Sequence, residues 1–342
     1  MSTGTSSAED SEWLQGSSGC ARRAIVSSNN YLVSSEYATV YDQSQSFFTS
    51  LSPVINSTYA SNQTNFKNAY SIFDYINVAT IHNESDTIPS GDLLTPETIN
   101  ELQVLANIHE WNLAYNSSDT VRAIAGATLA AEIVEGLNAT LVGKGAKPVN
   151  VQFGAYATFS SFFGLAQLQS VSADFEGIVD YAANMVFELV TNATVRSGDG
   201  YPSSDDVSVR FRFSNRSSGL TEPMVYPLFG QSETLLPFSD FAARMNKFAI
   251  GDTASWCQAC GNTTGVCATS ANDPGDGEST ASSKTSNHIS NAVAGVIGAL
   301  VTLVVILGVE ALIALVAGLR IVKRSTLTRG GNNDTSTTGI KA

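Results

Sequence analysis

The sequence has few charged residues, and basic residues are the scarcer kind. Only 14% of the 342 residues are charged, and 31 acidic side chains against 18 basic ones give a net charge of -13. A chain with this charge repels phosphate backbones, so we expect no nucleic-acid binding. Hydrophobic residues make up 43% of the chain, which is enough for one large or two medium domains with a buried core.

The motifs of the common catalytic and metal sites are also missing. There is no G-x-S-x-G, no P-loop and no dinucleotide fingerprint. The three histidines, His82, His109 and His288, show no metal-ligand spacing, so we expect neither a metal site nor a cofactor. His109 precedes Glu110 in a predicted helix, and we interpret it as a surface or half-buried residue rather than a catalyst.

Cysteine is rare, with four residues in the chain. Cys20 stands alone, whereas Cys257, Cys260 and Cys267 lie within "WCQACGNTTGVC". A four-cysteine zinc site or a redox C-x-x-C would suit a reducing compartment. Because the glycosylation triplet at Asn262 lies inside this cluster, disulfides are the better interpretation. Four cysteines allow three pairings, and the sequence does not choose among them.

Triplets of the form Asn-x-Ser/Thr are frequent, by contrast, and eight of them lie within residues 1–268. This density indicates a secreted, glycosylated domain. The predicted glycosylation sites are Asn56, Asn62, Asn83, Asn116, Asn138, Asn192, Asn215 and Asn262, with a ninth triplet at Asn333.

One long hydrophobic run is present, at residues 292–319, and Glu310 is its single charge. It exceeds the roughly 20 apolar residues that a membrane-spanning helix needs. Basic residues follow at once, which places the tail 320–342 in the cytosol. The polar segment 269–291 is then a flexible stalk, and residues 1–268 form a domain outside the cell. We therefore predict a single-pass protein of the plasma membrane or another membrane of the secretory pathway. Glu310 either pairs with a partner helix or snorkels to the interface.

The beginning of the chain does not fit this topology. "MSTGTSSAEDSEWLQG" is polar and acidic and has neither the basic nor the apolar region of a signal peptide. Since the glycosylation triplets and cysteines require an extracellular domain, we expect that this reading frame lacks its natural start.

Periodicity predicts helices in the first half of the chain. Apolar residues recur at helical spacing over 36–51, 65–82 and 118–145, and a further helix begins at Thr95-Pro96 and runs to about residue 115. Residues 1–30 are expected to be loop. The turn after Gly154 leads into another helix that begins near Tyr156.

The second half alternates more strongly and predicts strands. We expect strands over 149–154 and 207–215, and a weaker edge strand over 224–230. Residues 174–190 could form helix or strand, and we favour helix up to Ala183. A last helix is expected over 238–252. This order of elements indicates an α/β fold with a large helical part.

Four stretches of the chain, taken together, resemble a known protein family. They are "RAIAGATLAAEIV", "VQFGAYATFSSFFGLAQL", "VSVRFRFSN" and "FAIGDTASWCQACGNTTGVC". In order and wording they resemble the fungal membrane-anchored branch of the histidine acid phosphatase family, within the phosphoglycerate-mutase-like superfamily, over residues 10–268. The resemblance implies that family's sheet, incomplete here at the N-terminus. It also implies phosphomonoester hydrolysis through a phosphohistidine.

The catalytic motifs of this family are not present in the sequence. No Arg-His-Gly occurs in the sequence, and the family's His-Asp position reads Tyr156-Ala157, with Thr158 retained. Arg122 is the family-like position that would contact an anion. We therefore expect little or no phosphatase activity. The alternative is a non-catalytic cell-surface glycoprotein with this fold, which is either structural or binds a phosphorylated small molecule or another ligand.

Overall fold

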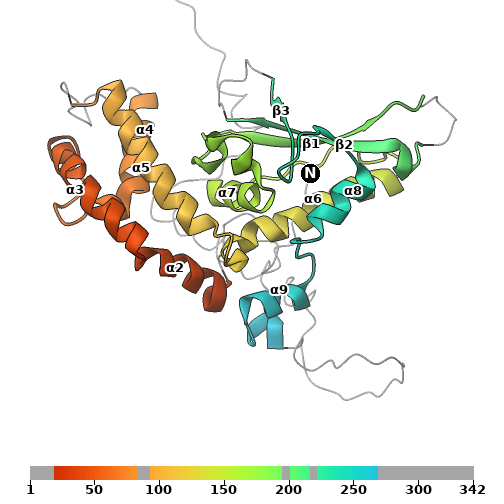
Figure 1. Cartoon of the computed structure of the whole chain (residues 1–342), viewed down its shortest axis with the longest axis horizontal. Coiled ribbons are helices and arrows are strands. Elements are labelled where there is room, and N and C mark those ends of the chain that lie inside the picture. The colour runs from red at the N-terminus through yellow and green to blue at the C-terminus, as the bar shows by residue number, and fades with distance from the viewer. Residues whose placement is uncertain (1–18, 83–92, 195–200, 216–221, 269–342) are drawn as a thin grey trace, which may run out of the picture. The chain divides into compact units, whose positions relative to one another are not determined.

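A computed structural model describes residues 19–82, 93–194, 201–215 and 222–268, all within one compact unit (Figure 1). The helices are α2 (Val26–Leu32), α3 (Ser35–Ile55), α4 (Ala69–Ile81), α5 (Pro96–Ala114), α6 (Ile124–Val142), α7 (Tyr156–Leu165), α8 (Phe238–Met245) and α9 (Thr253–Cys260). The strands are β1 (Asn184–Thr191), β2 (Val207–Ser214), β3 (Met224–Tyr226) and β4 (Leu235–Pro237). The fold is thus mixed helix and sheet, as predicted.

The predicted helix start at Thr95-Pro96 is confirmed, and side chains cap the starts of two helices. Ser34 accepts a hydrogen bond from the backbone of Tyr37 at the start of α3, and Thr95 accepts one from Thr98 at the start of α5. Pro96 occupies the first position of α5, where its missing N–H costs nothing. These side chains satisfy backbone donors that the helix itself leaves free.

Helices α2 to α5 enclose a core of their own. Its largest buried side chains are aromatic and aliphatic, among them Phe48, Phe66, Ile72 and Leu102, and Tyr156 of α7 packs against it. Figure 1 shows these helices on one side of α6 and α7, away from the sheet.

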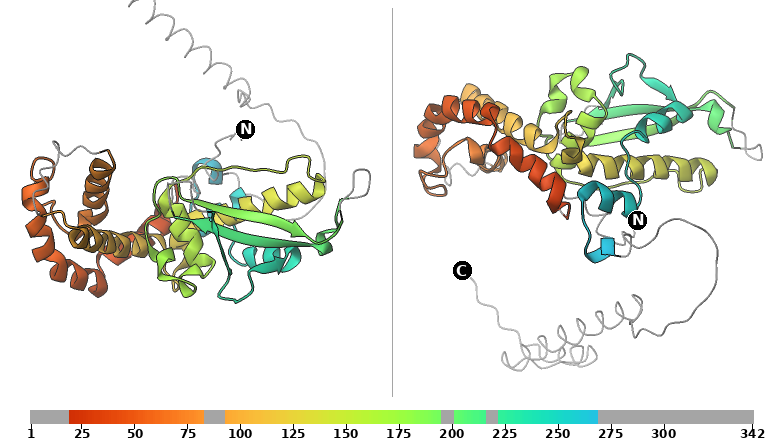
Figure 2. Two further views of the ribbon diagram at one scale, coloured as in Figure 1. Left: turned by 90° about the horizontal axis from the view of Figure 1, so that it is seen from above. Right: turned by 60° about the horizontal axis from the view of Figure 1, so that its bottom comes forward.

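The sheet is antiparallel, with the order β1-β2-β3, and β4 also pairs with β2. Its inward side chains, such as Phe187, Phe211 and Phe213, pack against α6, α7 and α8 in a second core. On the outward face, Arg210 donates to Glu188 at 2.6 Å, and the two residues are directly paired across the strands. Figure 2 shows α6 running along the sheet. The strand predicted over 207–215 is confirmed by β2, whose alternating burial leaves Arg210 and Arg212 on one face, and β3 lies at an edge.

Three predictions of local structure were wrong. Residues 149–154 form no strand, and Val149, Val151 and Phe153 are exposed by 75%, 55% and 82%. The sheet is built from β1 to β4 only, so among the described residues it offers this segment no partner. The region 174–183 is not a helix beyond the short 3₁₀ turn Ala173–Glu176. Residues 21–30, part of the predicted loop 1–30, are helical and belong to the segments Ala21–Ile25 and Val26–Leu32.

The predicted stalk, membrane helix and tail at 269–342, with Glu310 and Asn333, lie outside the described residues, as does Asn83. None of the described helices combines the length and hydropathy that crossing a membrane requires.

Candidate functional site

The junction between the predicted strand and α7 forms the starting point of the site. Ala155 is the N-cap of α7 with extended backbone, and its carbonyl accepts from the backbone of Thr158 at 3.1 Å. Tyr156 is therefore the first helical residue. Thr158 is buried, whereas Tyr156 and Ala157 are half-buried. The start of α7 thus fixes the backbone position of Tyr156. The Tyr156 side chain extends towards α5.

Tyr156 donates its hydroxyl proton to Glu110, which lies on α5. The Tyr156 hydroxyl is 2.7 Å from Glu110 Oε2, and Glu110 Oε1 is 2.7 Å from His109 Nδ1. The Glu110 side chain is only 13% exposed. A carboxylate this far from water needs such partners, so the three residues form one hydrogen-bonded chain.

The environment of Tyr156 makes it hard to ionise. Burial, followed by the charge of Glu110 and the hydrogen bond to it, raises the pKa of Tyr156 far above its ordinary value. A nucleophilic or basic phenol needs a lowered pKa, so this geometry favours a hydrogen-bond donor rather than a reacting oxygen.

His109 is at the opposite end of these hydrogen bonds from Tyr156, and aromatic rings surround it. Its ring is 5.3 Å from that of Phe66, edge to face, and 6.2 Å and 6.5 Å from those of Tyr37 and Tyr31. The residue is 6% exposed, and its Nε2 has no hydrogen-bond partner among the described residues. The prediction of a surface or half-buried histidine was therefore wrong, because the aromatic side chains of three elements close over it.

A pocket of about 340 Å³ opens beside Tyr156. Gly154, Ala155 and Tyr156 of the junction line one part of it, α4 lines another, and residues 178–183 line a third. The quoted junction therefore borders a cavity, although it carries no acid, base or nucleophile of its own.

The pocket is lined by aromatic rings and carboxylates. Tyr70 and Tyr156 lie with ring centroids 4.7 Å apart, and Tyr181 donates its hydroxyl to Asp74 Oδ1 at 2.7 Å. Asp180 lies beside Tyr181 in the lining. No Lys, Arg or His belongs to the lining that the described residues form. The pocket therefore presents aromatic faces and negative charge.

Arg122 lies in the interior and is 6% exposed. Its Nε donates to Ser27 Oγ at 3.1 Å, its Nη1 donates to the carbonyl of Asn112 at 2.6 Å, and its Nη2 donates to the carbonyl of Ser27. Burial lowers its pKa, and Asp119 opposes that shift. These bonds tie α2 to the end of α5, which gives Arg122 a structural role. Its contact with an anion stays a prediction.

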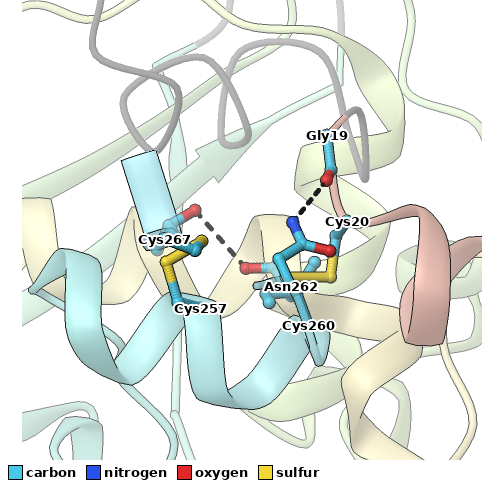
Figure 3. The surroundings of a disulfide bond; sticks show 8 residues. Gly19, Cys20, Cys257, Cys260, Asn262 and Cys267 are labelled. Carbon is cyan, nitrogen blue, oxygen red and sulfur yellow. Dashed lines mark hydrogen bonds between the residues drawn. A yellow bond between two sulfur atoms is a disulfide. The ribbon is translucent and has the colours of Figure 1, made fainter. Parts of the chain in front are cut away.

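The four cysteines pair at disulfide distance, which is consistent with the disulfide interpretation. Figure 3 shows Cys20 bonded to Cys260 and Cys257 bonded to Cys267. The first pair joins residues that are 240 positions apart in sequence, and the second closes a separation of 10. Asn262 reinforces the link, because its Nδ2 donates to the carbonyl of Gly19 at 2.9 Å.

The predicted glycosylation sites differ in exposure. Asn56, Asn62, Asn138 and Asn192 are exposed, while Asn116, Asn215 and Asn262 are half-buried. Attachment of a glycan requires access to the side-chain amide, so the exposed group is the better set of acceptors.

Sequence reasoning missed Glu110, Tyr70, Asp74 and Tyr181 as parts of one site. The four-residue spacing of Tyr70 and Asp74, which puts both on one face of a helix, was an available signal. The bond from Tyr156 to Glu110 spans 46 residues and leaves no local pattern.

No protein-family model matches the sequence, and no curated protein matches it either.

Proposed function

We propose that this chain is a non-catalytic, ligand-binding glycoprotein domain displayed at a cell surface, and that the pocket beside Tyr156 is its binding site. The observation that carries the proposal is the pocket itself. A volume of about 340 Å³ with aromatic walls and a few polar groups lies within the range of small-molecule sites. A purely structural glycoprotein would not need a cavity at this junction, so the pocket favours binding.

Phosphomonoester hydrolysis is the second candidate, because of the resemblance to histidine acid phosphatases. That chemistry needs an imidazole nucleophile and cationic groups around the phosphoryl oxygens. The described pocket lining has neither, and the side chain of Tyr156 donates to Glu110. Asp74 and Asp180 in the lining would repel a phosphate dianion. These features support binding without turnover.

The proposed location rests on the sequence. The run at 292–319 is long enough for a membrane span, and basic residues follow it. Exposed triplets at Asn56, Asn62, Asn138 and Asn192 agree with a domain in the secretory pathway. We therefore propose a single-pass protein with residues 1–268 outside.

A phosphatase assay separates the two candidates. The full chain, purified in mild detergent with its glycans, is incubated with 4-nitrophenyl phosphate at acidic pH. We expect no release of 4-nitrophenol above the protein-free rate. Clear turnover that follows the protein through purification would overturn the proposal and restore the hydrolase.

A further inference from the structure

The chemistry of the pocket wall indicates the class of ligand. Three tyrosines, Tyr70, Tyr156 and Tyr181, contribute rings to the lining, and Asp74 and Asp180 contribute carboxylates. Aromatic faces attract cations through their electron-rich centres, and carboxylates add an opposite charge at short range. Both features favour a positively charged guest over an anionic one.

Hydrogen bonds within the wall strengthen this preference. The hydroxyl of Tyr181 donates to Asp74, and that of Tyr156 donates to Glu110, each at 2.7 Å. A phenol that donates to an anion becomes polarised, which increases the electron density of its ring. Two of the three rings therefore have anionic acceptors at their hydroxyls, and their faces become better partners for a cation.

The carboxylate of Asp74 has no basic partner within the described residues, because no Lys, Arg or His nitrogen there forms an ion pair with it. The net charge of -13 adds a negative field that favours the approach of cations.

We propose that this pocket binds a small organic cation that carries an alkylated ammonium group. The rings of Tyr70, Tyr156 and Tyr181 contact its alkyl groups, and Asp74 provides the counter-charge. This inference rests on the proposed function, since it names the ligand class of the same site.

Choline and its neutral carbon isostere, 3,3-dimethyl-1-butanol, form a matched pair of probes. Both are titrated calorimetrically into the full chain in detergent. We expect choline to bind about tenfold or more tightly than the isostere, because only choline gains the cation–π and carboxylate interactions. Equal binding would overturn the cation inference and still support a ligand pocket. Binding of neither probe would also overturn the inference, whereas failure of the proposed function would appear as phosphatase turnover.

Two substitutions assign the effect to the pocket. Asp74→Asn is expected to weaken choline about tenfold and to leave the isostere unchanged. Tyr181→Ala removes a ring that is 57% exposed, so the fold should tolerate it, and choline binding should weaken about threefold or more. Asp240→Asn, on the exposed surface of α8, is the matched control with unchanged binding. Equal losses in Asp240→Asn and Asp74→Asn would mean that general charge, and not this pocket, attracts choline.

Discussion

Tyr156 begins α7 and donates its hydroxyl to Glu110, and its side chain both lines the pocket and packs against the helical core. The resemblance to histidine acid phosphatases predicts a catalytic pair at this position, with Tyr156 and Ala157 in place of its two residues. The structure gives Tyr156 a positive role, since it closes the chain that continues through Glu110 to His109.

Tyr156→Phe should therefore destabilise the protein. Glu110 would keep His109 but lose its second donor while 13% exposed, and an under-satisfied buried carboxylate costs about 1–3 kcal/mol. Urea denaturation of the purified chain measures this change in the free energy of unfolding. Tyr181→Phe removes the same kind of bond at a residue that is 57% exposed, and we expect a loss below about 1 kcal/mol. Equal losses in both variants would contradict the importance assigned to the Tyr156 bond.

The raised pKa of Tyr70 predicts a loss of stability at alkaline pH. Burial, followed by the charge of Asp74, raises its pKa from 10.0 to about 12. The folded state therefore holds this proton more tightly than the unfolded chain. Its contribution is complete below pH 10 and is lost as the pH rises towards 12. Urea denaturation at several alkaline pH values measures the free energy of unfolding. This free energy should fall less steeply with pH in Tyr70→Phe than in the wild type. Identical slopes would show that Tyr70 is not the responsible group.

The packing of α6 on α7 depends on one glycine. A Cβ at Gly126 would lie 2.4 Å from the backbone nitrogen of Phe162, so the two helices approach closely at this point. Gly126→Ala should cost about 1–3 kcal/mol, because backbone must move to admit the methyl group. Gly136→Ala on the same helix meets only the side chain of Asn150, at 3.0 Å, and should be neutral or stabilising by up to about 1 kcal/mol. Thermal unfolding of both variants checks this, and a harmless Gly126→Ala would refute the close approach.

Helices with strong local signals were predictable from sequence. Thr95 and Pro96 mark the start of α5, and the apolar spacing of α3, α4 and α6 persists for several turns. The strand β2 was equally clear, because one of its faces is buried and the other is charged. In these elements, local preference and tertiary burial agree.

The failures share a physical cause. Val149, Val151 and Phe153 alternate like a strand, but a strand exists only if a neighbour pairs with it. The pocket was hidden for a similar reason, since Glu110, Asp74 and Tyr181 join it through contacts that are distant in sequence. The sequence indicated the importance of the Tyr156 junction without its partners.

The two disulfides should contribute unequally to the stability of the whole domain. Cys20–Cys260 spans 240 residues and Cys257–Cys267 spans 10. In the chain-entropy account, removing the long link costs about 5 kcal/mol and removing the short one about 3 kcal/mol. Replacing each pair by Ser and comparing urea denaturation curves measures the difference. A larger loss from the short link would contradict the role assigned to Cys20–Cys260 as the main tie between the two ends of the domain.

The Tyr156 pocket is proposed to bind a small molecule, and blocking this pocket tests the proposal most directly. Ala155→Phe fills the pocket at the N-cap of α7, while Ala139→Phe adds the same ring on the exposed side of α6. Ligand-observed NMR with a panel of cationic, neutral and anionic fragments compares these variants with the wild-type chain. We predict fragments that bind the wild type and Ala139→Phe but not Ala155→Phe. A panel in which no fragment distinguishes Ala155→Phe from the other two proteins would contradict the claim.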